Sequence, residues 1–151
     1  MLVVYALIVF VILAADQLVK IWIQGNVALG ETFFTIPHIA DFVFVKNTGA
    51  AFSILSGKVS LLSVVSILFC VAVIVYFVWK RPKSPLLCTS LAMIFSGALG
   101  NAIDRTVYGY VVDFINVSFM NFPVFNIADI AITVGAGLIV VYEVFFDKNN
   151  E

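Results

Sequence analysis

Residues 59–79 read VSLLSVVSILFCVAVIVYFVW, an unbroken run without a charged side chain. Only Ser60, Ser63 and Ser66 clearly interrupt its apolar character. An α-helix of about 20 apolar residues spans the ~30 Å hydrocarbon core of a bilayer, so this run predicts a transmembrane helix. The three serines recur at every third position and share one helical face. Small hydroxyl residues on one face are typical of a helix–helix contact in lipid.

Three further segments are long and apolar enough to cross a membrane: residues 2–23, 85–103 and 127–146. The chain of 151 residues is 63% hydrophobic and 11% charged, with a mean hydropathy of +1.14. Soluble domains are about 45–50% apolar and about 25% charged. We therefore predict an all-α membrane protein with four transmembrane helices and a small extracytoplasmic β-rich loop, as a single integral-membrane domain over residues 1–151. The net charge of -1 argues against a nucleic-acid partner.

The orientation follows from the basic turn at residues 80–83, Lys-Arg-Pro-Lys, between the second and third segments. The positive-inside rule places this turn in the cytoplasm. Both termini are then cytoplasmic, and residues 24–58 and 105–126 face outward. Residues 41–46 alternate polar and apolar side chains as a strand does. We expect a small sheet resting on the membrane surface, with four aromatic residues at headgroup level: Phe33, Phe34, Phe42 and Phe44.

Polar residues lie in the apolar segments at positions that lipid disfavours: Asp16, Asn101, Asp104, Asn126 and Asp129. A charged Asp near the centre of a transmembrane helix costs roughly 2.5–3.5 kcal/mol on insertion scales. With Asp113, in an apolar loop between the last two segments, all of them converge on the outer leaflet in the predicted topology. Acidic residues in such a setting indicate a functional site by default.

Two of these carboxylates suit hydrolytic chemistry. Carboxylates held close together can share one proton, because like charges push their pKa values apart. Such a pair can activate water against an amide and protonate the leaving nitrogen without a metal. Asp113, in an apolar run, and Asp129, at the start of a helix, are the candidates. On the residues alone, a chance pairing or a proton relay in a transporter is an equal alternative, although a relay predicts acids spread through the membrane depth.

The remaining polar residues have simpler explanations. We expect Asp104 to pair with its neighbour Arg105, and Asp16 to pair with Lys20 and hold the first helix against the outer loop. Other catalytic schemes are weaker, because the single His38 cannot build a zinc site and we expect no metal or other cofactor. Three other kinds of residue need no catalytic role. We expect Cys70 and Cys88 to be inert, and Gly97 and Gly100 to allow close packing of helices. Ser53 would need a nearby lysine to act as a nucleophile.

Five blocks of the chain, in order, resemble the bacterial lipoprotein signal peptidases, the signal peptidase II family. The first two are Asp16-Gln17 with Lys20, and residues 47–53, Asn-Thr-Gly-Ala-Ala-Phe-Ser. The third is residues 97–105, Gly-Ala-Leu-Gly-Asn-Ala-Ile-Asp-Arg. The last two are residues 111–114, Val-Val-Asp-Phe, and residues 125–129, Phe-Asn-Ile-Ala-Asp. Ser96 is a minor departure, because many members have another small residue there.

The resemblance implies a four-helix aspartyl protease of the bacterial cytoplasmic membrane. It would remove signal peptides from prolipoproteins by cutting before a cysteine that already carries diacylglycerol. Asp113 and Asp129 would be the catalytic dyad, and the substrate-binding or supporting residues would be Asp16, Lys20, Asn47, Gly49, Asn101, Asp104, Arg105 and Asn126. We expect a monomer whose partners are this lipid-modified substrate and membrane lipid.

Overall fold

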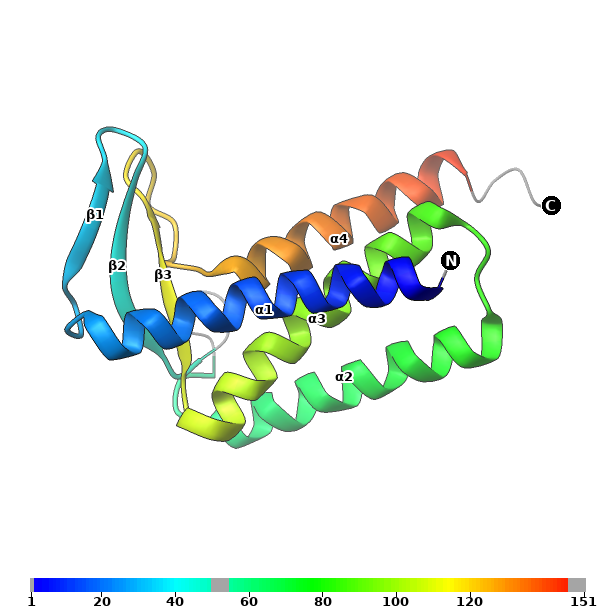
Figure 1. The fold of residues 1–151 in the computed structure, drawn as a ribbon, viewed down its shortest axis with the longest axis horizontal. Helices are drawn as coiled ribbons and strands as arrows, with labels where there is room; N and C mark the ends of the chain where they lie inside the picture. Colours follow the sequence, from blue (N-terminus) through cyan, green and yellow to red (C-terminus); the bar gives the residue numbers. More distant parts are fainter. Residues whose placement is uncertain (1, 50–54, 147–151) are drawn as a thin grey trace.

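The computed structural model describes residues 2–49 and 55–146. Within them lie four helices: α1 (Leu2–Asn26), α2 (Val59–Lys80), α3 (Pro85–Tyr108) and α4 (Ile127–Phe145). Three strands complete the described chain: β1 (Thr32–Ile36), β2 (Ala40–Asn47) and β3 (Val111–Val117). The helices run side by side, the sheet lies across one end, and both termini lie at the other end (Figure 1). All four helices have the length and apolarity of membrane spans, which confirms the predicted fold class.

Two helices continue beyond their predicted ends. Helix α1 runs to Asn26, and α3 runs to Tyr108 and ends on Gly109 in the left-handed conformation, whose N–H donates to the carbonyl of Arg105. The predicted end at residue 103 was placed before the first charged pair of this segment. The helix continues because those charged side chains find partners inside the protein rather than lipid.

Helix α3 is the centre of the bundle and packs against the other three helices. Its glycines allow this close approach. A Cβ on Gly100 would lie 2.7 Å from Oδ2 of Asp16, and one on Gly97 would lie 2.7 Å from Cγ1 of Ile132 and collide with the carbonyl of Ala128. The predicted packing role of Gly97 and Gly100 is confirmed.

Helix α2 packs chiefly against α3, and most of its surface is exposed at the outside of the bundle. Of the three serines predicted to face another helix, Ser63 is buried and Ser66 is half-buried, whereas Ser60 is exposed. Cys70 of α2 and Cys88 of α3 are buried free thiols, as expected for small apolar residues. The helix contact therefore follows the serine stripe only in part.

The three strands form one antiparallel sheet in the order β1-β2-β3. Its inner face packs on the end of α1 through a small core that includes Ile23, Phe44 and Phe114. Phe44, one of the four aromatic residues expected at headgroup level, belongs to this core and is only 4% exposed, so it does not present its ring to the surroundings. Phe34 is exposed, and Phe33 and Phe42 are half-buried.

Strand β3 was predicted as part of a loop, and this was wrong. Val111, Val112, Asp113 and Phe114 are buried in succession, so the strand lacks the alternation that identifies a half-exposed strand in a sequence. It is covered on one side by the core and on the other by the helix ends. The structure thus holds Asp113 in the sheet, opposite Val45 of β2 and next to an irregularity of the ladder between Phe42 and Val45.

Candidate active site

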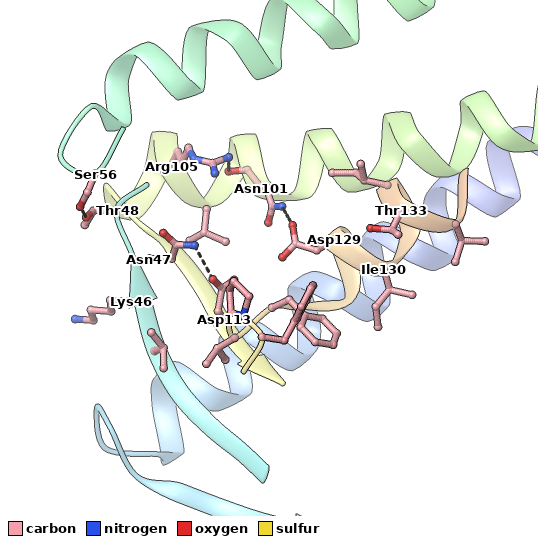
Figure 2. Close-up of a pocket in the computed structure, with 18 residues that line it drawn as sticks. Lys46, Asn47, Thr48, Ser56, Asn101, Arg105, Asp113, Asp129, Ile130 and Thr133 are labelled. Carbon is pink, nitrogen blue, oxygen red and sulfur yellow. Dashed lines mark hydrogen bonds between the residues drawn. The ribbon is translucent and has the colours of Figure 1, made fainter. Parts of the chain in front are cut away.

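A pocket of about 810 Å³ lies where the sheet meets the helices. It is lined by β2, β3, the ends of α3 and α4, and residues 122–125, which lead into α4. Figure 2 shows Asn47, Asp113, Asn101 and Asp129 on facing sides of this space. Both carboxylates of the predicted dyad therefore face one pocket.

Asp113 reaches the pocket from β3 and is 2% exposed. Its Oδ2 accepts a hydrogen bond from Nδ2 of Asn47 at 2.8 Å, and its Oδ1 accepts one from Nδ2 of Asn126 at 2.7 Å. Burial, and next the negative charge of Asp129, raise the pKa of Asp113 to about 7, although the two amides act in the opposite direction. This carboxyl can therefore hold or release a proton near neutral pH.

Asp129 occupies the third position of α4, and its carboxylate also caps the helix. Its Oδ2 accepts from the backbone N–H of Asn126 at 3.2 Å, while the Asn126 side chain accepts from the N–H of Asp129 at 2.9 Å, which completes a capping box. The other oxygen, Oδ1, accepts from Nδ2 of Asn101 at 2.8 Å. The start of the helix thus fixes the direction of this carboxylate.

The chain returns from β3 to α4 along a short bridge. The backbone of Phe125 exchanges two hydrogen bonds with Ile115, at 2.8 and 3.0 Å. This contact places Asn126, the next residue, between the two carboxylates, where its amide also donates to Oδ1 of Asn101 at 3.1 Å. Asn126 therefore joins both members of the dyad, which explains how residues on a strand and on a helix come together.

A second group of charges lies behind Asn101, fully inside the bundle. Nζ of Lys20 lies 2.8 Å from Oδ2 of Asp16 and 2.9 Å from Oδ2 of Asp104, and it donates to Oδ1 of Asn101 at 3.0 Å. All three charged side chains are at most 1% exposed. The predicted pair of Asp16 and Lys20 is confirmed.

Two predictions about this group are wrong. Among the described residues Asp104 pairs with Lys20 and not with Arg105, because adjacent residues on a helix point in different directions. Nor does the Asp16 pair hold α1 against the outer loop. Asp16 accepts from the N–H of Ala128 at 3.0 Å, and Asp104 accepts from the N–H of Val112 at 3.1 Å. The group thus ties α1 to α3, to the start of α4 and to β3.

Arg105 lies on the pocket wall, half-buried. Its Nη2 donates to the carbonyl of Gly49 at 3.1 Å, and the N–H of Gly49 donates to Oδ1 of Asn47 at 2.9 Å. Its Nε is buried and has no hydrogen-bond partner within the described part of the chain. This chain of contacts fixes the loop after β2 beside Asp113 and leaves one guanidinium donor unused.

All ten residues predicted for the site thus belong to one connected network around the pocket. Gln17 belongs to it as well and was not predicted as a site residue. Its Nε2 donates to Oδ1 of Asp104 at 3.0 Å and to the carbonyl of Gly100 at 3.3 Å. The sequence does contain a signal for Gln17, because its amide side chain lies next to Asp16 within a membrane segment.

The pair of carboxylates resembles an acid–base site, and the alternatives have less support in the geometry. Residues 2–49 and 55–146 hold no group of three His, Cys, Asp or Glu side chains suited to a metal ion. Lys20 is enclosed by carboxylates, so it is not available to activate a serine. Ser53, the predicted partner in that scheme, lies outside the described residues.

Comparison with known proteins agrees with this geometry. A family model described as signal peptidase (SPase) II matches residues 8–145. A lipoprotein signal peptidase of Clostridium acetobutylicum is 40% identical over 148 residues, which cover 96% of each chain. One of Enterococcus faecalis is 38% identical over 148 residues, which cover 98% of this chain and 92% of the relative.

The fold is also similar to solved structures. One bacterial membrane enzyme is 33% identical and has a TM-score of 0.92, over 98% of this chain and 92% of its own. A second is 34% identical with a TM-score of 0.85, over 95% of this chain and 94% of its own. Because the family model and full-length relatives agree over nearly the whole sequence, this chain belongs to the signal peptidase II family.

Proposed function

We propose that Asp113 and Asp129 are the catalytic dyad with which this protein removes signal peptides from diacylglyceryl-modified prolipoproteins, cutting before the lipidated cysteine. The protein is an aspartic endopeptidase by family. The observation that carries the assignment of the dyad is that two carboxylates, Asp113 buried and Asp129 half-buried, face one pocket and are each held by asparagine amides. This is the arrangement in which one proton is shared.

In the proposed reaction the pair holds one proton. The ionised carboxylate takes a proton from a water molecule as the water oxygen attacks the scissile carbonyl carbon. The protonated carboxyl then donates its proton to the leaving nitrogen as the C–N bond breaks. The products are a carboxylic acid on the signal peptide, which releases its proton to solvent, and an amine on the cysteine. The pair again holds one proton at the end, so no metal or covalent intermediate is needed.

The other network residues act on substrate or on the dyad. Asn47 and Asn126 hold Asp113, and Asn101 holds Asp129, by the hydrogen bonds given above. Arg105, which lines the pocket and holds the carbonyl of Gly49, would face the substrate backbone. Asp16, Lys20 and Asp104 brace these residues from behind through the amide of Asn101.

The site is proposed to lie near the outer leaflet of the cytoplasmic membrane. The basic turn after α2 and both termini lie at the end of the bundle away from the sheet (Figure 1), so the positive-inside rule places all three in the cytoplasm. A membrane-impermeant thiol reagent should label a cysteine at Gly57 in intact cells but not one at Ser84. Labelling only at Ser84 would reverse the orientation.

We also propose that the chain acts as a monomer and as one domain, since its described residues by themselves form a pocket that both carboxylates of the proposed dyad face. Light scattering of the purified protein in detergent measures its mass. A catalytically active species of one chain supports the proposal, and activity confined to a dimer contradicts it.

The function is tested by incubating the purified protein with a diacylglyceryl-modified prolipoprotein in detergent or lipid. The expected product is the shortened lipoprotein with the modified cysteine at its N-terminus, formed equally well in EDTA. The same prolipoprotein without lipid should be cut far more slowly. No cleavage of the lipidated form rejects the function, loss in EDTA that zinc restores rejects the mechanism, and equal rates reject the specificity.

A further inference from the structure

We propose that the side-chain hydroxyl of Thr133 is a substrate-positioning group, which donates a hydrogen bond to a backbone carbonyl in the last helical turn of the signal peptide. The proposal rests on the function proposed above. Thr133 lies on α4 four residues after Asp129 and lines the same pocket. Figure 2 shows its side chain beside the pocket, on the same wall as Ile130.

The hydroxyl of Thr133 differs from three hydroxyls of α3, which donate to carbonyls of their own helix: Ser90 to Leu86 at 2.7 Å, Ser96 to Met93 at 2.9 Å and Thr106 to Ala102 at 2.7 Å. Thr133 is exposed and has no hydrogen bond within the part of the chain that the structure describes. A hydroxyl without a partner in an apolar environment costs about 1–3 kcal/mol on protein scales.

A second donor on the opposite wall also lacks a partner. Nε of Arg105, on α3, is buried and unpaired among the described residues, although its Nη2 binds the carbonyl of Gly49. Both Arg105 and Thr133 line the pocket, so each of its two walls carries a side chain with a donor that is unpaired among the described residues, but only Thr133 is an exposed residue. A ligand that presents carbonyl oxygens satisfies the Thr133 hydroxyl, whereas a purely apolar ligand does not.

The end of a transmembrane helix presents such carbonyls. The last four C=O groups of an α-helix have no partner within the helix, and in lipid each must find one elsewhere. Thr133 lies about 6 Å further from the sheet than Asp129, at 1.5 Å of rise per residue. A signal-peptide helix that rises toward the dyad therefore ends beside Thr133, and its last carbonyls point outward toward this hydroxyl. Beyond this turn the chain must be extended for its peptide bond to reach the dyad.

The test compares Thr133→Val, which keeps the shape and removes the hydroxyl, with Thr133→Ser, which keeps the hydroxyl. For a lipidated prolipoprotein, Thr133→Val should lower kcat/KM about 3- to 10-fold, as expected for one neutral hydrogen bond, chiefly through a higher KM. Thr133→Ser should stay within about twofold of the wild type. Thr106→Val is the matched control, because that hydroxyl is satisfied within α3 and lies outside the pocket lining.

A second measurement identifies the acceptor. In synthetic lipopeptide substrates, single amides before the cut are replaced by esters, whose carbonyls accept hydrogen bonds less well. At one position the ester should slow the wild type and Thr133→Ser but not Thr133→Val. Equal kcat/KM for Thr133→Val and the wild type, or the same ester profile for both, overturns the proposal. A wild-type enzyme that cuts no lipidated substrate instead rejects the function itself.

Discussion

Two pairs of carboxylates among the described residues are held in different ways. Asp16 and Asp104 share the ammonium group of Lys20, at 2.8 and 2.9 Å, deep between α1 and α3. Asp113 and Asp129 are held by the neutral amides of asparagine side chains. A shared cation makes the first pair part of a buried ion-pair group that joins α1 to α3, which suits a structural role. Amides orient the second pair without neutralising it, which leaves a proton to be shared and makes it suited to chemistry.

The two pairs are linked through one side chain. The carbonyl oxygen of Asn101 accepts from Lys20, and its amide nitrogen donates to Asp129. The cation thereby fixes which end of the Asn101 amide faces the dyad. The ion pairs of Lys20 thus help to orient the proposed dyad through Asn101. Among the described residues, Lys20 itself forms no ion pair with Asp113 or Asp129.

The dyad should be the most sensitive part of the network in catalysis. Asp113→Asn and Asp129→Asn should each lower kcat for a lipidated prolipoprotein by about 10²–10⁴-fold, because one carboxylate cannot act as both base and acid. Both proteins should still insert and accumulate, since asparagine can keep the shape of each site. Western blotting of membrane fractions controls for protein level. Near-normal cleavage by either variant removes that residue from the dyad.

The structural pair should matter most for stability. Lys20→Met leaves two buried carboxylates without their cation, and breaking a buried ion pair costs about 3–5 kcal/mol. The variant should unfold at a lower temperature in detergent or fail to accumulate, and Asp104→Asn should show a smaller loss through the same contact. Lys58→Met, at an exposed position, is the control. A Lys20→Met protein as stable as the wild type would contradict the structural role.

The packing around the ion pair of Asp16 and Lys20 can be tested at the close approach of α1 and α3. In Gly100→Ala the new Cβ would lie 2.7 Å from Oδ2 of Asp16, so the ion pair must shift. Overpacking of this kind costs about 1–3 kcal/mol. Gly137→Ala meets nothing within 4 Å and should be neutral or stabilising, as alanine favours a helix. Equal melting temperatures for the two variants would show that the contact is unimportant.

The smallest expected change is a shift in pH dependence. The dyad needs one proton, and the pKa of Asp113 is raised to about 7, so kcat/KM should fall as the pH rises through about 7. The Asn47 amide lowers the pKa of Asp113 because it favours the ionised form. Asn47→Ala should therefore move this alkaline limb to higher pH. The dependence of kcat/KM on pH is measured from pH 5 to 9. If the alkaline decrease occurs at the same pH in both proteins, Asn47 does not influence the pKa of Asp113.

The sequence predicted the four spans because lipid makes them conspicuous. The same background drew attention to the polar residues within the spans, which are among the ten proposed for the site. Apolar runs of sufficient length are unambiguous in a bilayer, and Asp, Asn and Lys within them stand out against that background. The resemblance to the family then linked residues on different segments, which spacing along one helix cannot do. Local spacing alone found the Asp16–Lys20 pair, which lies four residues apart on one helix.

What the sequence did not predict depends on contacts between distant segments. Asp104 prefers Lys20, 84 positions away along the chain, to its neighbour Arg105, and only the packing of α1 on α3 brings these groups together. Strand β3 is buried at four successive positions, including Asp113, so its sequence lacks the alternation that distinguishes a strand from a loop. Phe44 resembles the less buried aromatic residues around it, and its burial follows from the docking of the sheet on the end of α1.

The dyad is divided between a strand and a helix, and this division bears on which bond is cut. Asp113 is fixed to the sheet, Asp129 is fixed to α4, and Asn126 ties the two together. A signal peptide held in the bilayer by its own apolar length presents to this junction whichever peptide bond lies at that height. On this proposal, the depth of a peptide bond in the bilayer helps to determine whether the enzyme cuts it. One extra helical turn in the signal peptide should slow cleavage even when the residues beside the bond are unchanged.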